Sequence, residues 1–400
     1  MKRSTIRLSK KGTIYTPRFA LICLSSLFFS ASYNMLIPEL PAYLSQMGGA
    51  PYIGLIIALF TLTAGISRPF SGKLTDTIGR KPVMIFGALV CLISGFLYPI
   101  LTSVSGFLIL RLFHGFSTGF NPTATATYVA DIVPKERWGE ALGIQGISFS
   151  TGLALGPALG SLIKLHFSFD VLFYSSSIIA LISLLFIANL KETLVQKQRF
   201  ERKLLKISKT DIIAPEVLPA AIVTFLTYVA FGVILTLIPD WSQHVGFVNK
   251  GTFFIVFTIA SLLVRFVAGK MSDQYGRIRV IHVGLVLLVV SLFLIGYRDT
   301  TRGLLTGAAL YGLAMGIISP AVNAWTIDMS HPRYRGKAMA TMYIALESGI
   351  GLGALFSGWY YRETLAHVPH VLYACGVLAL LALLYMGWRH YKKVDRTTGL

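Results

Sequence analysis

Among the acidic and strongly basic residues, only Glu347 and Arg111 are predicted to lie deep inside long apolar runs, where a charge is costly, whereas Arg68 and Arg265 lie near the ends of theirs. Glu347 stands in the middle of the run from 338 to 360, and Arg111 and His114 share the run from 106 to 130. Ionisable residues in apolar spans are rare and are functional candidates by default. A buried carboxyl prefers its neutral form until a cation approaches, which is the behaviour that a proton carrier needs. A protonated, hydrogen-bonded glutamic acid that joins two helices explains Glu347 equally well.

The other candidates for proton coupling also have simpler explanations. Arg111 precedes Asp131 by 20 residues, so it lies toward the opposite end of its run, where its side chain could reach the lipid headgroups. The neighbouring His114 could shuttle a proton, although packing with a hydrogen bond is the commoner role for such a histidine. Glu39, at the end of the first apolar run, is the fourth candidate for proton coupling.

The composition is that of a membrane protein. Of the 400 residues, 54% are hydrophobic and only 13% are charged, against about 25% charged residues in soluble proteins. This excludes a disordered chain and makes a soluble enzyme a poor interpretation. The net charge of +19 does not indicate nucleic-acid binding, because the basic residues form short clusters and no continuous stripe. Neither the three cysteines nor the histidines have the spacing of metal ligands, and we expect no cofactor.

A helical span needs about 20 apolar residues, and this rule predicts an all-helical chain with twelve membrane-spanning helices. They are expected at 19–40, 52–70, 83–102, 106–130, 141–163, 171–190, 215–239, 251–268, 280–297, 303–327, 338–360 and 370–388. Residues 19–190 and 215–388 then form two bundles of six, with a basic linker at 191–214 and basic tails at 1–18 and 389–400. No loop has room for a catalytic domain and no P-loop sequence is present, so we expect neither an enzyme nor an ATP-driven pump.

The distribution of basic residues predicts the orientation. Of the 36 Lys and Arg residues, 28 fall in the tails, the linker and the loops of one side, and five fall in the opposite loops. Because positive charge is retained in the cytoplasm, both termini are expected there. The short outer loops suit the cytoplasmic membrane of a bacterium. The basic linker could also attract anionic headgroups, although a topology signal suffices to explain it.

The two halves repeat each other at a constant shift of 197 residues. Between 68 and 80, six of thirteen positions are identical after the shift, where chance would give roughly one. The matching pairs are Arg68 and Arg265, Gly72 and Gly269, Lys73 and Lys270, Asp76 and Asp273, Gly79 and Gly276, and Arg80 and Arg277. The same shift relates Asp131 to Asp328. Transporters built from such repeats bind their substrate between the two bundles.

The segment 72–81, GKLTDTIGRK, resembles the signature loop of the major facilitator superfamily, and the segment 269–277 resembles its weaker second copy. The resemblance extends from about residue 19 to 388 and implies two pseudo-symmetric six-helix bundles. In this family such loops act as charge networks that latch the two halves on the cytoplasmic side. The implied latch residues are Gly72, Asp76, Gly79, Arg80, Asp131, Gly269, Asp273, Gly276, Arg277 and Asp328. Interfacial charges that only help topology are the alternative.

Within this latch, Asp76 has a specific expected partner. It lies at the cytoplasmic end of a hairpin, and the span that begins near Ala338 starts at the same side of the membrane. Anions are stabilised at helix N-termini. We therefore expect the Asp76 carboxylate to face that helix start, with Arg80 bridging Asp76 to Asp131 and Arg277 bridging the equivalent pair.

Two further motifs resemble the drug:proton antiporter branch of the family. The segment GLALGPALG at 152–160 resembles its antiporter signature, and its Gly152, Gly156, Pro157 and Gly160 are expected to form a hinge, since glycines allow close helix packing and proline bends a helix. The Pro-x-x-Pro at 38–41 resembles a second motif, or simply ends a span. Asn34 departs from the pattern, because some relatives have an acidic residue there.

The family resemblance also implies that the first, fourth, seventh and tenth spans line the cavity. Candidate substrate contacts on these spans are Tyr33, Asn34, Phe120, Asn121, Tyr228, Phe231, Tyr311, Asn323 and Trp325. Aromatic rings stack on planar or cationic ligands, although core packing is the commoner reason for each ring.

We therefore expect a secondary transporter, working as a monomer, that exports drug-like compounds or small metabolites in exchange for protons. The alternative is a proton-coupled importer of a small nutrient with the same fold. Its partners are a small-molecule substrate, protons and the lipid bilayer, and no nucleic acid is expected.

Overall fold

The computed structural model describes residues 14–49, 52, 55–208, 212–247, 252–297, 299–361 and 365–398, and these residues form helices and turns without a strand. The first half contains α1 (Pro17–Asn34), α2 (Leu40–Gln46), α3 (Leu55–Thr77), α4 (Arg80–Leu97), α5 (Val104–Ile132), α6 (Trp138–His166) and α7 (Phe169–Ala188). The second half contains α9 (Leu218–His244), α10 (Thr252–Tyr275), α11 (Arg277–Tyr297), α12 (Thr301–Met329), α13 (Arg335–Tyr361) and α14 (Val368–Thr398). Short 3-10 turns lie at Lys135–Arg137, Arg202–Leu205, Pro215–Val217, Pro332–Tyr334 and Leu365–His367.

Twelve long helices within these described ranges coincide with the twelve predicted spans, so the all-helical class is confirmed. Nine of them are long and apolar enough to cross a membrane, and α10, which bends by 45° after Arg265, makes a tenth. The remaining two, α1 and α5, have a lower hydropathy because they carry many serines, threonines and other polar residues. That all twelve cross the bilayer stays a prediction.

The first and the last predicted spans end elsewhere in the structure. The first helix ends at Asn34, and residues 35–39, which were predicted to complete it, form a turn that leads into the separate helix α2. A proline lies in the first turn of α2, where backbone N–H groups have no acceptor within the helix, so a residue without an N–H loses no hydrogen bond there. The last helix continues to Thr398, so the predicted tail at 389–400 is helical up to that residue. Residues 1–13 of the predicted N-terminal tail and 209–211 of the linker lie outside the described residues, as do Lys250, Arg298 and Arg362.

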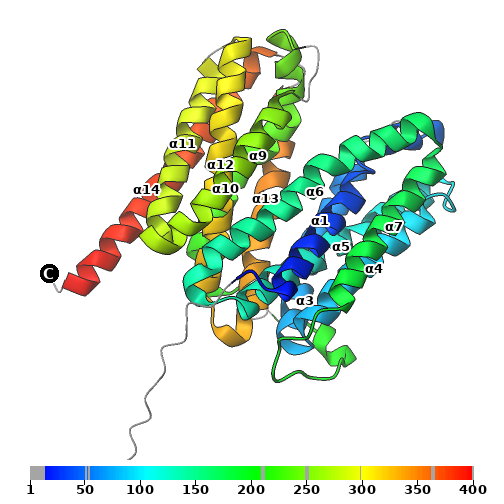
Figure 1. The fold of residues 1–400 in the computed structure, drawn as a ribbon. Helices are drawn as coiled ribbons and strands as arrows, with labels where there is room; N and C mark the ends of the chain where they lie inside the picture. The colour runs from blue at the N-terminus through cyan, green and yellow to red at the C-terminus, as the bar shows by residue number, and fades with distance from the viewer. Residues whose placement is uncertain are drawn as a thin grey trace, which may run out of the picture.

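The helices form two bundles with the same internal packing (Figure 1). In the first, α1 packs against α6 and α7, and α3 packs against α5. In the second, α9 packs against α13 and α14, and α10 packs against α12. The equivalent pairs follow the same chain order, as the repeat requires.

The glycines that were predicted to form a hinge in α6 lie against α1 of the same bundle. A methyl group at Gly156 would lie 2.8 Å from the carbonyl oxygen of Ala31, and one at Gly152 or Gly160 would overlap the carbonyl oxygen of Leu27 or Met35. The helix itself continues through Pro157 without a break. These glycines therefore set the distance between two neighbouring helices.

The two bundles meet at one end and diverge toward the other (Figure 1). Their contacts join α3 to α13 and α6 to α10. The end where they meet carries the α3–α4 and α10–α11 turns, and we call it the latch end. A methyl group at Gly72 would lie 2.8 Å from the Ala340 Cβ atom, and one at Gly269 would lie 2.6 Å from the Gly139 carbonyl oxygen. Only glycine allows the two bundles to approach this closely.

Candidate functional site

At the latch end, Asp76 joins the first bundle to the start of a helix in the second. Its two carboxylate oxygens accept hydrogen bonds from the backbone N–H groups of Gly336 and Lys337, at 2.7 and 2.8 Å. These N–H groups lie in the first turn of α13, where they have no partner within the helix. The Asp76 side chain is 5% exposed, so water screens this interaction little.

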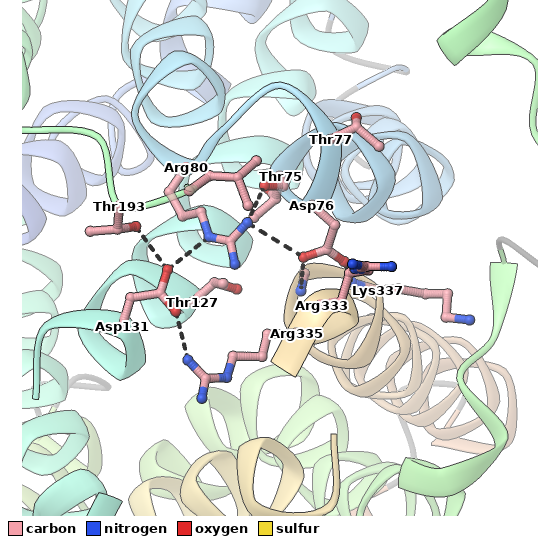
Figure 2. Close-up of polar contacts among 12 residues, drawn as sticks. Thr75, Asp76, Thr77, Arg80, Thr127, Asp131, Thr193, Arg333, Arg335 and Lys337 are labelled. Atoms are coloured by element: carbon pink, nitrogen blue, oxygen red, sulfur yellow. Dashed lines mark hydrogen bonds and ion pairs between the residues drawn. The ribbon is translucent and has the colours of Figure 1, made fainter. Parts of the chain in front are cut away.

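Arg80 and Asp131 extend this contact across the latch end (Figure 2). The Arg80 guanidinium lies 3.8 Å from Asp76 Oδ1 and donates to Asp131 Oδ2 at 2.9 Å. The other oxygen of Asp131 accepts from Arg335 of the second bundle, at 2.6 Å. A single carboxylate thus connects an arginine of each bundle.

The second copy of the motif makes the equivalent contacts in the opposite direction. Asp273 on α10 accepts from the backbone N–H groups of Gly139 and Glu140 at the start of α6, at 2.9 and 2.8 Å. Arg277 pairs with Asp273 and donates to Asp328 at 2.9 Å. Each bundle therefore supplies a carboxylate to a helix start of the other.

Two glycines with positive φ allow the turns of the latch. Gly79 has φ 123° and Gly276 has φ 90°, a backbone conformation that residues with a Cβ atom rarely adopt. Each precedes the arginine of its motif, and Gly79 is followed by the first turn of α4. The Glu192 carboxylate accepts from the N–H groups of Arg80 and Lys81 there, at 3.1 and 3.0 Å.

Between the bundles lies a cavity of about 360 Å³, lined by residues of both. Ligand sites for small molecules typically start at about 300 Å³. Aromatic rings make up much of its wall: Tyr33, Phe60, Phe149, Tyr228, Phe231, Phe257 and Tyr343. Three charged side chains also line it, namely Arg68, Arg265 and Glu347.

Arg68 and Glu347 form an ion pair across this cavity. Arg68 Nη2 of α3 lies 3.0 Å from Glu347 Oε1 of α13, and the two side chains are 3% and 16% exposed. The same guanidinium donates to Thr123 Oγ1 at 3.0 Å and lies 4.5 Å from the centre of the Tyr343 ring. A change of charge at Glu347 would therefore alter a direct contact between the two bundles.

The sequence profile of the Major Facilitator Superfamily matches residues 22–252 and 220–399. The chain belongs to the major facilitator superfamily. It is 28% identical over 349 residues to multidrug resistance protein 2 of Bacillus subtilis, covering 82% of this chain and 84% of that protein.

Two further comparisons agree with this family. The chain is 27% identical over 322 residues to the multidrug resistance protein MdtG of Salmonella typhi, covering 77% of this chain and 79% of that protein. The fold is similar to that of the human organic anion transporter MFSD10, with a TM-score of 0.82 at 22% identity, covering 93% of this chain and all of the other. The chain is accordingly a membrane transporter of this superfamily and not an enzyme.

Five of the predicted site residues line the cavity of this transporter: Tyr33, Tyr228, Phe231, Asn323 and Glu347. The other predicted cavity residues are buried within one bundle: Asn34, Phe120, Asn121, Tyr311 and Trp325. Asn34 donates to the Ser30 carbonyl oxygen at 2.8 Å, and Asn121 to that of Met84 at 3.3 Å. Glu39 lies at the start of α2 and does not line the cavity.

Arg111 and His114 lie inside the first bundle, behind the cavity wall. Arg111 donates to the Ile56 carbonyl oxygen at 2.9 Å, and its guanidinium stacks 4.6 Å from the centre of the Phe60 ring. The Tyr98 hydroxyl lies 3.2 Å from both Arg111 Nη1 and His114 Nδ1. This geometry accounts for both side chains as hydrogen-bonded packing partners.

The prediction that only Arg111 and Glu347 are deep ionisable residues is wrong, because Arg68 and Arg265 also line the cavity. The predicted spans ended at residues 70 and 268, which placed both arginines at a membrane surface. In the structure α3 continues to Thr77 and α10 to Tyr275. The repeat could have identified both arginines as candidates for the cavity, since Arg68 and Arg265 are its first matching pair.

Proposed function

We propose that the chain is a proton-coupled exporter of drug-like compounds or small metabolites that works by alternating access. The observation that carries this proposal is the Arg68–Glu347 ion pair, which joins the two bundles inside the cavity. A transporter couples proton binding to movement when the titrating group holds one of its two conformations together. Glu347 meets that requirement.

The closed latch and the predicted topology together support an outward-facing conformation for this structure. Residues 19–190 and 215–388 form the two moving bundles, and the excess of basic residues assigns both termini and the latch end to the cytoplasm. The closed latch then seals the cytoplasmic side, and the diverging ends face outward (Figure 1). We place the protein in the cytoplasmic membrane of a bacterium as a monomer.

Proton binding and substrate release are linked in this scheme through Glu347. A proton that enters from the open side neutralises the carboxylate and removes its attraction for Arg68. The freed guanidinium and the lost inter-bundle contact weaken the outward-facing state. After the change of conformation, the proton leaves to the cytoplasm and a new substrate enters the cavity.

The direction of transport is supported by the relatives, two of which are multidrug resistance proteins. The cavity is consistent with such cargo, because its wall combines aromatic rings with few charges. Proton-driven export requires that substrate and proton cross the membrane in opposite directions.

Accumulation of a panel of dyes, antibiotics and aromatic metabolites in cells with and without the protein tests this proposal. We expect lower accumulation of at least one compound in cells that contain the protein, and loss of the difference when a protonophore collapses the proton gradient. Equal accumulation of the whole panel would contradict export. Higher accumulation would make the protein an importer.

A further inference from the structure

The two arginines of the cavity are related by the repeat but have different surroundings. Arg68 has three partners on neighbouring helices: the Thr123 hydroxyl, the Tyr343 ring and the Glu347 carboxylate. A shift of 197 residues carries Arg68 to Arg265 on α10. It also defines the three positions where the partners of Arg265 would lie.

None of these three partners is retained. The position of Thr123 is occupied by Pro320, that of Tyr343 by Gly146, and that of Glu347 by Ser150. A proline has no hydroxyl, a glycine has no ring, and a serine cannot neutralise a guanidinium. The repeat-related positions around Arg265 thus carry none of the three groups that contact Arg68.

Arg265 accordingly lies in the cavity without a counter-charge. Its Nε donates to Ser261 on the same helix at 3.3 Å, and Nη1 lies so close to Gly146 that a methyl group there would overlap it. Among the described residues, no carboxylate lies within 4.0 Å of this guanidinium. The described lining residues carry two positive charges and one negative charge. A buried charge without a partner is costly, so an anion is the ligand that best stabilises this cavity.

We propose that Arg265 binds the carboxylate of the transported compound, and that the substrates are amphipathic aromatic acids. The planar guanidinium matches a carboxylate in a two-point hydrogen bond. Ser150, a small side chain at the position equivalent to Glu347, lines the cavity, and Phe149, Phe231 and Phe257 line the same cavity and can pack on the aromatic body. This inference rests on the proposed function, since it assumes that the cavity is the transport site.

Equilibrium binding to the purified protein tests the inference without any proton gradient. The probes are three indole compounds of similar size, indole-3-acetate, indole-3-acetamide and tryptamine, and the corresponding three naphthalene compounds. A hydrogen bond to a charged group contributes roughly 1.5–3 kcal/mol. We therefore expect the carboxylates to bind about ten- to a hundredfold more tightly than the neutral amides.

Two variants test whether Arg265 causes the preference for carboxylates. Arg265→Gln should bind carboxylates and amides equally, with unchanged affinity for the amides as evidence of folding. Ser150→Glu supplies the carboxylate that the repeat lacks and can pair with Arg265, so it should abolish the preference for carboxylates over amides. Arg279→Gln removes an exposed arginine elsewhere on the second bundle and should bind like the wild type.

The inference is overturned if no carboxylate binds, if the wild type binds amides or amines as tightly as acids, or if the preference survives in Arg265→Gln. Failure of the proposed function has a different signature. In that case the carboxylate preference and its loss in both variants are observed, but cells with and without the protein accumulate the same amounts of every compound.

Discussion

Replacing Asp76 with asparagine keeps the size of the side chain and removes the charge that joins α3 to the start of α13. The carboxylate accepts one hydrogen bond at each oxygen, from Gly336 and from Lys337. An asparagine offers one acceptor oxygen, and its NH₂ group then faces the second backbone N–H. One hydrogen bond is lost, and the remaining one loses its charge.

The size of this effect follows from the burial of the site. Hydrogen bonds to charged groups contribute about 1.5–3 kcal/mol each, and the Asp76 side chain is only 5% exposed. We expect Asp76→Asn to weaken the closed latch by about 2 kcal/mol, which is roughly a thirtyfold shift in population away from the state described here. Asp273→Asn should act equally, since Asp273 makes the same two contacts.

Electron spin resonance distances between labels at Leu165 and Gln243 measure that shift, because both residues are exposed and lie at the C-terminal ends of α6 and α9, away from the latch. The latch-closed population should fall in each variant and fall further in the double variant. Asp299→Asn removes an exposed carboxylate outside the latch and should leave the distances unchanged. A double variant with the wild-type distance distribution would refute the role of these carboxylates.

Two further predictions concern packing inside the first bundle. Gly156→Leu should lower the thermal unfolding temperature, because even a methyl group there would lie 2.8 Å from the Ala31 carbonyl oxygen and overpacking costs about 1–3 kcal/mol. Gly351→Leu is the control, because a methyl group at Gly351 would meet no atom of another helix within 4 Å. Equal unfolding temperatures would contradict the packing role. Arg111→Gln should also unfold at lower temperature, because its hydrogen bonds to the Ile56 carbonyl oxygen and the Tyr98 hydroxyl lie inside the first bundle, behind the cavity wall. Its pH-gradient dependence of transport should stay intact. Loss of that dependence in a fully stable Arg111→Gln protein would assign Arg111 to coupling instead.

The fold and the latch motif were accessible from the sequence because both depend on local patterns. Apolar runs of about 20 residues predict helices directly, and the repeated Gly-Lys-x-x-Asp motif lies on one hairpin in each half. The helix start opposite Asp76 followed from topology alone. The partners Arg335 and Glu192 were missed, since each joins the latch from a segment distant in sequence.

The cavity could be predicted only in part, because nearly uniform apolar helices do not reveal which face is turned inward. Tyr228 and Tyr311 are both aromatic residues on predicted cavity helices, yet Tyr228 lines the cavity and Tyr311 is fully buried between helices. The Arg68–Glu347 pair joins residues 279 positions apart. No spacing pattern in the sequence predicts a contact between such distant residues. The predicted span also ended at residue 70, which placed Arg68 near a membrane surface.

The most direct test of proton coupling is the flux of an exported compound in vesicles with and without an imposed pH gradient, for the wild type and for Glu347→Gln. Glutamine keeps the shape of the side chain and cannot release a proton. We predict that the gradient accelerates flux through the wild type and leaves flux through Glu347→Gln at its gradient-free rate. Equal acceleration of both proteins would contradict the assignment of Glu347 as the group that couples protons to the movement of the two bundles.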